Sequence, residues 1–458
     1  MSVLSAKITA ARAVGALSRR TGRGGTSLPG KLLVRLEPRA IGLLASRLRA
    51  GSAVISATNG KTTTAAMVAA ILEPTGRQVV HNRAGANMAG GVASALLAAA
   101  RGRGMAGDAG LFEVDEFWLD RVVPELRPRA LLLANLFRDQ LDRYGELETI
   151  ADRWAAVLAT EGWAPPGFRL VLNADDPLVA DLGRGRDDVT YFGVEDDGVT
   201  LPGLAHASDS KHCRRCGAPY AYDAVYLGHL GRYHCPTGDA VRPAPQVSAA
   251  RIALDGTRGA RFALRLGEES ADVRLPLPGL YNVYNALGAA ALARAMGATT
   301  TQIVAGLEAM RAAFGRAETV RLAGRDMAIL LVKNPAGANE VLRTLALDAG
   351  EHDLFAVLND RTADGRDVSW VWDADFETIA PRVRRATCSG TRAAELALRL
   401  KYAGVAGDRL RVVPDLQSGL EAALGDGTGR LVAIPTYTAM LELRELVVAR
   451  GAAEGSFA

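Results

Sequence analysis

The sequence has few cysteines and no long apolar run. Only four of its 458 residues are cysteine, and Cys213, Cys216 and Cys235 fall within 23 residues. Such a cluster indicates a metal site rather than a set of disulfide bonds. No run approaches the roughly 18–20 apolar residues of a membrane span, and the start lacks the apolar core of a secretory signal. These absences argue against a disulfide-built secreted domain and a membrane-spanning protein, and they predict a cytoplasmic protein.

Acidic residues are almost missing from the first 50 positions. That segment holds ten lysines and arginines against Glu37 alone, a net charge of +9, whereas the whole chain carries +4. A basic start of this kind fits a transit peptide, a patch that binds a membrane surface, or a helix that faces phosphate. A helix with a solvated basic face fits equally well.

The length and the hydrophobic pattern predict several α/β domains. A chain of 458 residues is too long for one core, so two or three domains are expected. Short apolar runs alternate with helical stretches over residues 53–176, which predicts a mainly parallel, doubly wound sheet. A polar stretch from about 203 to 247 carries the cysteines. Segments typical of antiparallel strands follow it, and then an Ala-rich helical region over 284–313. The predicted domains are residues 1–50, 51–316 and 317–458.

The strongest motif is "SATNGKTTT" at residues 56–64, between a predicted buried strand and a predicted helix. Gly60 would let the backbone approach phosphate groups, and Lys61 would reach the β and γ oxygens. A hydroxyl from Thr62 or Thr63 is suited to Mg²⁺. Ile55 stands where the general pattern G-x-x-x-x-G-K-[ST] has its first glycine. The position of the motif nevertheless favours a phosphate-binding loop over an ordinary helix start.

Three further polar runs close predicted strands. In "LFEVDE" (111–116), alternation places Glu113 and Asp115 on one face, where a carboxylate could hold Mg²⁺ or simply be solvated. A neighbouring phosphate loop favours the magnesium role. "NLFRDQLDRYGE" (135–146) and "LNADDP" (172–177) are two more strand ends, and we expect all of them to face one crevice.

The cysteines occur in "HCRRCG" and "YHCPTGD", which look like two halves of a zinc ribbon. The second half is incomplete, because Thr237 and Gly238 stand where a fourth cysteine would lie. A working ribbon and a degenerate one both fit, and the fourth ligand is unknown. Candidates for it are His212, His234 and Asp239.

Three other segments leave alternatives open. "LNDRTADGRDVSW" (358–370) carries three aspartates at a strand end and fits a metal site, a catalytic carboxylate or a polar turn. "VKNPAGANEVL" (332–342) fits a substrate loop or a plain connection. "GLYNVYNALGAAALARAMG" (279–297) predicts a capped core helix, in which Asn282 and Asn285 could also face a nucleotide.

In their order and spacing, "ATNGKTTT", "NLFRDQLDRYGE", "LNADDP" and "YNVYNAL" resemble the Mur ligases. The closer resemblance is to the MurT subunits of lipid II isoglutaminyl synthase. It rests on "GTSLPGK" (25–31), the cysteine ribbon, "KNPAGANE" and "LNDRTADGRDVSWVWDADFE", and it covers essentially the whole chain. The resemblance implies a Mur-ligase-like P-loop ATPase domain with an inserted zinc-ribbon-like segment, plus a C-terminal α/β domain. Gln140 stands where amino-acid-adding Mur ligases have histidine, as it does in MurT subunits.

The resemblance also implies an activity in peptidoglycan synthesis. Such a chain would use ATP and Mg²⁺ to activate the α-carboxylate of D-glutamate in the lipid II stem peptide as an acyl phosphate. A separate GatD-like glutaminase, forming a heterodimer with it, would supply ammonia. Zn²⁺ in the ribbon stays open. The basic start, including Arg19, Arg20 and Arg23, would suit a pyrophosphate-bearing substrate at the inner face of the membrane.

Site residues follow from the same resemblance. The implied ATP contacts are Thr58, Asn59, Gly60, Lys61, Thr62, Thr63 and Asn285, with Thr62 and Glu113 on Mg²⁺. Asp367 would complete the catalytic triad of the partner glutaminase, whereas Asp360 and Asp364 have no implied role. Cys388, the one cysteine outside the ribbon, has no histidine nearby in sequence and is expected in the core. One alternative is a stand-alone amino-acid ligase of the Mur or folylpolyglutamate type. Another is a basic, zinc-ribbon nucleic-acid-binding protein. It leaves the phosphate loop unexplained, so no nucleic-acid partner is expected.

Overall fold

The computed structural model describes residues 3–20, 27–82, 86–139, 147–204, 208–238, 240–311, 316–425 and 429–452. Gln140, Asp239 and Arg23 therefore lie outside the described residues, as do the side chains of Arg19 and Arg20. No helix within these ranges combines the length and the apolar character of a membrane span.

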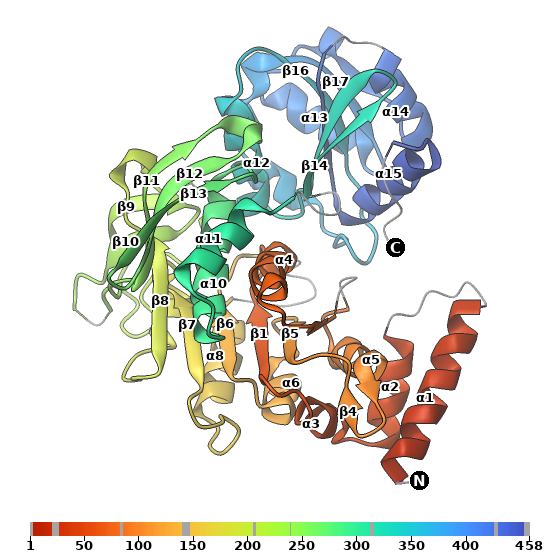
Figure 1. Cartoon of the computed structure of the whole chain (residues 1–458). Coiled ribbons are helices and arrows are strands. Elements are labelled where there is room, and N and C mark those ends of the chain that lie inside the picture. The colour runs from red at the N-terminus through yellow and green to blue at the C-terminus, as the bar shows by residue number, and fades with distance from the viewer. Residues whose placement is uncertain are drawn as a thin grey trace.

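A nine-stranded sheet forms the centre of the larger part of the molecule (Figure 1). Its order is β13-β12-β11-β8-β7-β6-β1-β5-β2. The strands from β2 to β11 in this order run parallel, and β11, β12 and β13 pair antiparallel. Their bounds are β1 (Ser52–Ser56), β2 (Val79–His81), β5 (Ala109–Glu113), β6 (Ala130–Leu133), β7 (Arg169–Asn173), β8 (Val189–Val194), β11 (Val247–Leu254), β12 (Ala260–Leu266) and β13 (Glu269–Leu275). The prediction of a mainly parallel, doubly wound sheet is confirmed.

Helices cover both faces of this sheet because its central strands are apolar on both sides. In β1, Ala53 and Ile55 face one core and Val54 the other, as the two-residue period requires. The first core contains α4 (Lys61–Leu72), α10 (Leu280–Ala295) and α11 (Thr300–Glu308). The second contains α5 (Ala89–Ala99), α6 (Leu119–Leu126), α8 (Leu147–Ala159) and α9 (Pro177–Asp181).

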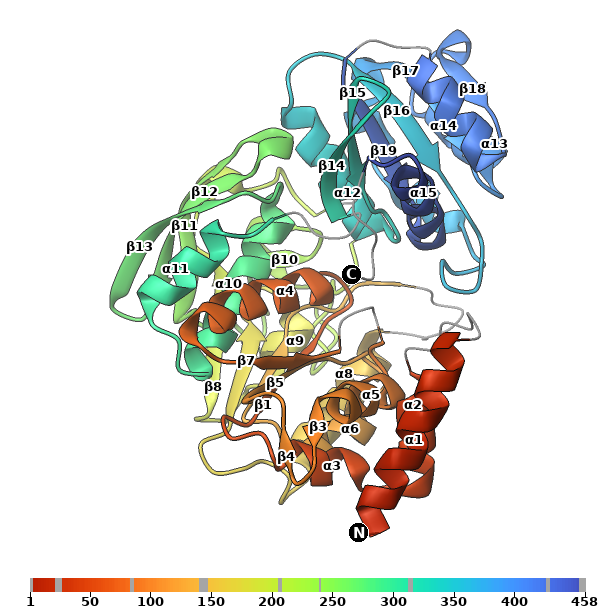
Figure 2. The same cartoon turned by 45° about the vertical axis from the view of Figure 1, so that its right-hand side comes forward.

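The N-terminal helices join the second core. They are α1 (Val3–Arg20), α2 (Leu28–Leu36) and α3 (Ala40–Ala45). Gly30 of α2 lies so close to α5 that a Cβ on it would stand 1.9 Å from the carbonyl oxygen of Gly90. Arg12 of α1 donates to the carbonyl oxygen of Leu97 at 2.8 Å. The basic start thus forms helices that pack on the central unit, as Figure 2 shows for α1, α2 and α5.

Two hairpins lie outside the large sheet. β9 (Ala221–Leu227) and β10 (Leu230–His234) pair within the predicted insertion, and β3 (Ala100–Arg101) pairs with β4 (Gly104–Met105). The helical region expected over 284–313 consists of two helices, α10 and α11. Gly297 breaks it with φ +89°, and Thr299 then caps α11 with its side chain.

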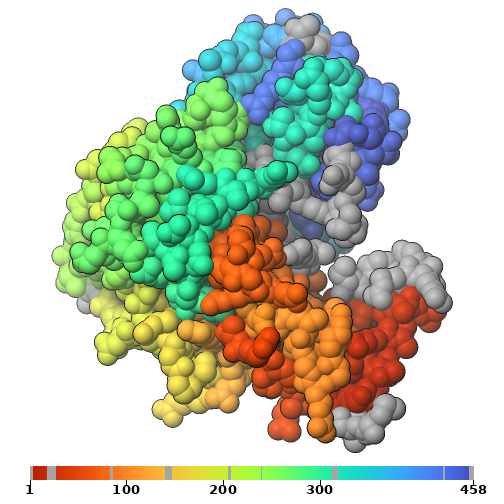
Figure 3. Space-filling view, viewed as in Figure 1, coloured from red at the N-terminus to blue at the C-terminus, as the bar shows by residue number. Residues whose placement is uncertain are grey.

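A second sheet builds the C-terminal unit, in the order β14-β15-β19-β16-β17-β18. Only β14 is antiparallel to its neighbour among these strands. The bounds are β14 (Arg316–Leu322), β15 (Arg325–Leu330), β16 (His352–Val357), β17 (Val383–Ser389), β18 (Leu410–Val412) and β19 (Leu431–Pro435). Helices α12 (Pro335–Leu347) and α13 (Ala393–Tyr402) pack in one core, α14 (Leu416–Gly425) and α15 (Tyr437–Ala449) in another. In Figure 3 this unit, in blue, lies at the opposite end from the red N-terminal helices. The exact domain boundaries stay a prediction.

Candidate active site

The loop between β1 and α4 has the backbone shape that a phosphate group requires. Gly60 precedes α4 with φ +88°, in the left-handed region that glycine tolerates. A Cβ there would also stand 2.0 Å from Oδ1 of Asn285. The amides of Lys61, Thr62 and Thr63 start the helix, so they have no partner within it. These residues line a pocket of about 350 Å³, and a helix start facing a pocket favours an anion.

Lys61 is held in its charged form beside this loop. Its Nζ lies 2.8 Å from Oε2 of Glu116 and also donates to the carbonyl oxygen of Ala57. Burial alone would lower the pKa of Lys61, but Glu116, followed by Asp115 and Asp139, raises it above its ordinary value. The pocket therefore contains a permanent ammonium group whose present counter-ion is a carboxylate.

Thr62, in the first turn of α4, contacts Glu113 at the end of β5. The Thr62 hydroxyl donates to Oε2 of Glu113 at 2.7 Å, and Glu113 is 2% exposed. The backbone of Glu113 is fixed on both sides by the Asn82 amide at 2.9 and 2.8 Å. Nε2 of His81 lies 3.4 Å from Oε1. A hydroxyl and a carboxylate in contact are an oxygen pair suited to Mg²⁺, so these side chains fit the predicted ion.

Residues 135–139, which we call the strand-end segment, follow β6 and support the loop. The side chain of Asn135 accepts from the Asn59 amide at 2.9 Å and donates to the Asn59 carbonyl at 3.0 Å. The Phe137 amide donates to the Thr58 hydroxyl at 3.1 Å. The hydroxyl of Thr58 is thus used to hold the loop, although the sequence indicated only a phosphate contact.

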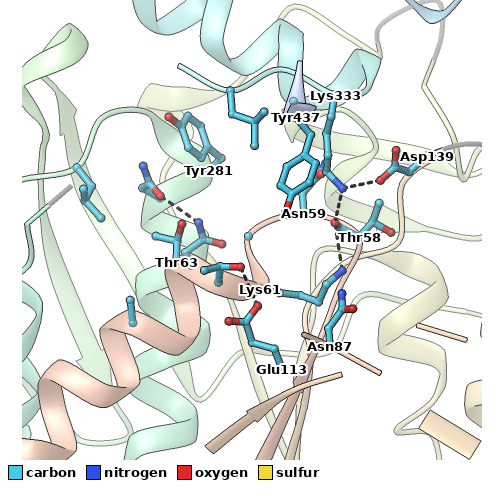
Figure 4. Close-up of a pocket in the computed structure, with 18 of the residues that line it drawn as sticks. Thr58, Asn59, Lys61, Thr63, Asn87, Glu113, Asp139, Tyr281, Lys333 and Tyr437 are labelled. Atoms are coloured by element: carbon cyan, nitrogen blue, oxygen red, sulfur yellow. Dashed lines mark hydrogen bonds and ion pairs between the residues drawn. The ribbon is translucent and has the colours of Figure 1, made fainter. Parts of the chain in front are cut away.

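The C-terminal unit closes the pocket from above (Figure 4). Nζ of Lys333 donates to the Thr58 carbonyl at 3.1 Å and pairs with Asp139 at 2.5 Å. The side-chain amides of Asn334 and Asn59 form two reciprocal hydrogen bonds of 3.0 and 3.3 Å. The turn after β15 is therefore part of the pocket rather than a plain connection.

Asn285 reaches the pocket from α10 and is buried. Its Oδ1 accepts from the Thr64 hydroxyl at 3.3 Å, and its Nδ2 donates to Oδ1 of Asn282 at 3.0 Å. Asn282 in turn donates to the Pro278 carbonyl at 2.7 Å. These bonds fasten α10 to α4, as expected of a core helix, and the contact of Asn285 with a nucleotide stays a prediction.

The aspartates of the 358–370 run have three different environments. Asp364 is buried, and it accepts from the Thr438 amide at 2.7 Å at the start of α15. Asp360 pairs with Arg392 at 2.8 Å. Ala363, between them, lines the pocket. Asp360 and Asp364 thus anchor the loop that brings Ala363 to the pocket.

Asp367 is exposed and does not line that pocket. It accepts from the Ser369 amide at 2.8 Å, at the start of the 3₁₀ helix η4 (Ser369–Asp373). Bonds from the side chain and the amide of Ser369 lower the pKa of Asp367 below its ordinary value. The structure therefore presents an ionised carboxylate on the surface of the C-terminal unit.

Three cysteine sulfurs come together as predicted. The Sγ atoms of Cys213, Cys216 and Cys235 all lie within 4.8 Å of one another, with Cys216 and Cys235 at 3.4 Å. Zinc at about 2.3 Å from each sulfur would set them about 3.8 Å apart. The spacing of the three cysteine sulfurs is therefore compatible with zinc binding.

The fourth ligand stays open. Within the described ranges no histidine or carboxylate joins the three sulfurs, and the candidate Asp239 lies outside those ranges. Nδ1 of His234 lies 3.7 Å from Asp223 instead. The Thr237 hydroxyl lies beside two of the sulfurs, 2.9 Å from Sγ of Cys235 and 3.1 Å from Sγ of Cys216.

The sequence did not reveal several residues that line the pocket or, like His81, Asn82 and Asn135, bond to residues that line it. His81 and Asn82 end a run that indicated only a strand, and Asn135 and Asp139 were not singled out within their polar run. Tyr281 and Tyr437 also line the pocket. Nothing in the sequence connects a tyrosine at the start of α15 with a phosphate loop near residue 60. Cys388 is fully buried in β17, where burial raises the pKa of its thiol to about 12, as expected of a core residue.

Known proteins resemble the chain in sequence and in fold. The Mur ligase middle domain family matches residues 55–215, and the MurT ligase C-terminal family matches residues 331–440. The lipid II isoglutaminyl synthase (glutamine-hydrolyzing) subunit MurT of Staphylococcus aureus strain N315 is 33% identical over 438 residues, 93% of this chain and 94% of that protein. The subunit of the same name from Streptococcus pneumoniae is 31% identical over 432 residues, 94% of each chain.

A solved structure shows the same fold. The pseudomurein peptide ligase type C from Methanothermus fervidus matches with a TM-score of 0.66 and 23% identity, covering 89% of this chain and 80% of that one. Fold and site together therefore define an enzyme of the Mur ligase class, a carbon–nitrogen ligase. Within that class, the chain belongs to the MurT family.

Proposed function

We propose that the chain amidates the α-carboxylate of the D-glutamate in the lipid II stem peptide, using ATP and ammonia from a glutaminase subunit. The substrate oxygen attacks the γ-phosphorus and ADP leaves. Ammonia then attacks the carbonyl carbon of the acyl phosphate, inorganic phosphate departs with the bonding electrons, and a proton is lost to solvent. Phosphorylation is required because a free carboxylate has no adequate leaving group.

The pocket residues support this chemistry. Lys61 and the first amides of α4 would hold the β and γ phosphates, and Lys333 would approach them from the opposite side. Thr62 and Glu113 would hold Mg²⁺, which neutralises charge on the transferred phosphoryl group. Burial between two units excludes water that would hydrolyse the acyl phosphate.

The position of Asp367 supports the proposal that the ligase and the glutaminase are two separate subunits. It is exposed, ionised and outside the ATP pocket. A carboxylate that orients the histidine of a Cys-His-Asp triad needs these properties, and it needs no metal. Among the described cysteines, three lie together in one cluster and Cys388 is buried with a raised pKa. We infer that the cysteine and the histidine belong to a GatD-like partner.

An aromatic patch beside Asp367 supports the same partner. Trp372 in η4 is 48% exposed and Tyr402 of α13 is 72% exposed, with ring centroids 5.7 Å apart. Arg399 fixes η4 by donating to the carbonyls of Val371 and Ala374 at 3.1 and 2.7 Å. Exposed tryptophan and tyrosine side chains are typical centres of protein interfaces, and the turn that carries Trp372 continues directly from Asp367.

The test uses the complex with its glutaminase and follows lipid II amidation with glutamine or with ammonium as donor. Asp367→Asn should abolish glutamine-dependent amidation and leave ammonium-dependent amidation at the wild-type rate. Lys61→Ala should abolish both. Asp408→Asn, another exposed aspartate of the C-terminal unit, should change neither.

Two results would contradict the proposal. Loss of both activities in Asp367→Asn would place this carboxylate in the ligase site. Turnover of a free amino acid without any partner would instead support a stand-alone amino-acid ligase.

A further inference from the structure

We propose that His229 is a positioning residue of the ligase site. From the tip of the β9–β10 hairpin, it would hold the strand-end segment (residues 135–139) against the phosphate loop. This inference rests on the proposed ATP-dependent ligation, and it assigns a role to the inserted segment that does not depend on zinc.

His229 is fully buried although it lies in the turn of a hairpin. It is 0% exposed, and its ring lies 4.9 Å from the ring of Phe137 in the strand-end segment. Its Nε2 lies 3.4 Å from Oδ2 of Asp176, and neither ring nitrogen makes a hydrogen bond to the described residues. Burial alone disfavours the imidazolium, and the nearby Asp176 carboxylate offsets that cost through an ion pair.

Asp176 connects His229 to the strand-end segment. Its Oδ1 accepts from the amides of Leu178 and Val179 at 3.0 and 3.2 Å and so caps α9. Its Oδ2, the atom that faces His229, accepts from the Leu136 amide at 2.9 Å. The buried charge of Asp176 therefore binds the histidine and the strand-end segment through one oxygen.

Leu136 lies between the two residues that hold the phosphate loop. Asn135 forms the two bonds to Asn59, and the Phe137 amide bonds the Thr58 hydroxyl. A shift of the Leu136 amide must move both neighbours, because each is one peptide unit away. The contacts thus run without a gap from the hairpin tip to the loop that would bind ATP.

Among the residues that the structure describes, two acidic side chains act on His229. These are Asp176 at the start of α9 and Asp209, which accepts from the Arg138 amide at 3.1 Å and pairs with the Arg138 guanidinium. The Tyr222 hydroxyl donates to the His229 carbonyl at 2.8 Å. Burial alone would lower the pKa of His229, but Asp176 and then Asp209 raise it above its ordinary value.

The neighbouring aspartate has the same kind of partner. Asp175, also 0% exposed, pairs through Oδ1 with Nε of Arg242 at 2.6 Å. Both carboxylates of "LNADDP" are therefore matched by cations that the inserted segment, about 203–247, supplies. This pairing favours a role for the inserted segment in holding the residues that follow β7 in place.

The first test compares two buried histidines in the complete complex. His229→Gln should raise the KM for ATP and lower kcat, so that kcat/KM falls roughly tenfold to 100-fold. The assay temperature is one at which circular dichroism shows the variant to be folded. His352→Gln removes a buried histidine of β16 that bonds the Leu345 carbonyl at 3.0 Å. It should lower the Tm and leave both constants unchanged. Wild-type constants in His229→Gln would overturn the proposal.

The second test needs neither a variant nor activity. A raised pKa means that the His229–Asp176 pair is fully formed at low pH and is lost as pH rises through the folded-state pKa. Hydrogen exchange of the wild-type protein, corrected for intrinsic rates, should therefore show residues 135–139 losing protection between pH 6 and pH 9. Strand β16 should not change. Equal protection of 135–139 at both pH values would refute the role of His229 while leaving the proposed ligation untouched.

Discussion

Lys333 of the C-terminal unit donates a hydrogen bond of 3.1 Å to the carbonyl oxygen of Thr58 in the phosphate loop of the central unit. Lys61 approaches the same oxygen from the other side, at 3.5 Å. Two ammonium groups from distant parts of the sequence thus converge on one point of the pocket. Such convergence favours a ligand with several negative charges, as a nucleoside triphosphate and a carboxylate are together.

Lys333→Ala should lower amidation with either nitrogen donor by about 100-fold, because it removes a charge aimed at the transferred phosphoryl group. Lys333→Arg should recover part of the rate. The measurement is steady-state ADP release with lipid II and ammonium. Lys401→Ala, at an exposed lysine of α13, serves as the matched control, and equal rates in both alanine variants would remove Lys333 from the site.

Glu113→Gln should keep the fold and lose the metal. A glutamine can still accept from the Thr62 hydroxyl, but it lacks the charge that binds Mg²⁺. The apparent KM for Mg²⁺ should rise at least about tenfold, with a fall in kcat. Titration of ADP release with MgCl₂ measures both. Glu148→Gln, an exposed position on α8, should titrate as wild type, and the same curve for Glu113→Gln would contradict the magnesium role.

Most of the fold could be predicted from the sequence because short segments of the chain show which helices and strands they form. Apolar runs of four to eight residues mark the buried parallel strands, and the phosphate loop lies between β1 and α4 as its residues indicate. The edge strand β14 escaped prediction, because an edge strand is defined by its neighbour rather than by its own residues.

The site was predictable only where its segments belong to the same sheet. Glu113 and Thr62 could be paired because a strand end and a helix start of the same sheet meet at one edge. The contact between Lys333 and Thr58 spans 275 residues, and no local pattern encodes how two sheets close on each other. His229 was invisible for the same reason, since a histidine in a polar loop gives no sign that it is fully buried.

Thr237→Cys should complete the metal site of the inserted segment. The hydroxyl of Thr237 lies 2.9 Å from Sγ of Cys235 and 3.1 Å from Sγ of Cys216, so a thiolate there would make a fourth ligand. We expect zinc affinity to rise by about tenfold or more and the Tm in the presence of zinc to rise with it. Competition with a chromogenic chelator measures the affinity. Thr200→Cys, outside the cluster, is the control, and equal affinities in the two variants would show that residue 237 does not provide a ligand.

Trp372→Ala combined with Tyr402→Ala should separate the two subunits without impairing the ligase site. Removing two exposed rings from the centre of an interface costs about 2 kcal/mol or more, roughly a 30-fold weaker Kd. Calorimetry with the glutaminase subunit measures the Kd, and ammonium-dependent amidation should stay at the wild-type rate because neither ring lines the pocket. Leu347→Ala, which removes a 53% exposed leucine at the end of α12, is the matched control. An unchanged Kd in the double variant would mean that the partner reaches Asp367 from another side.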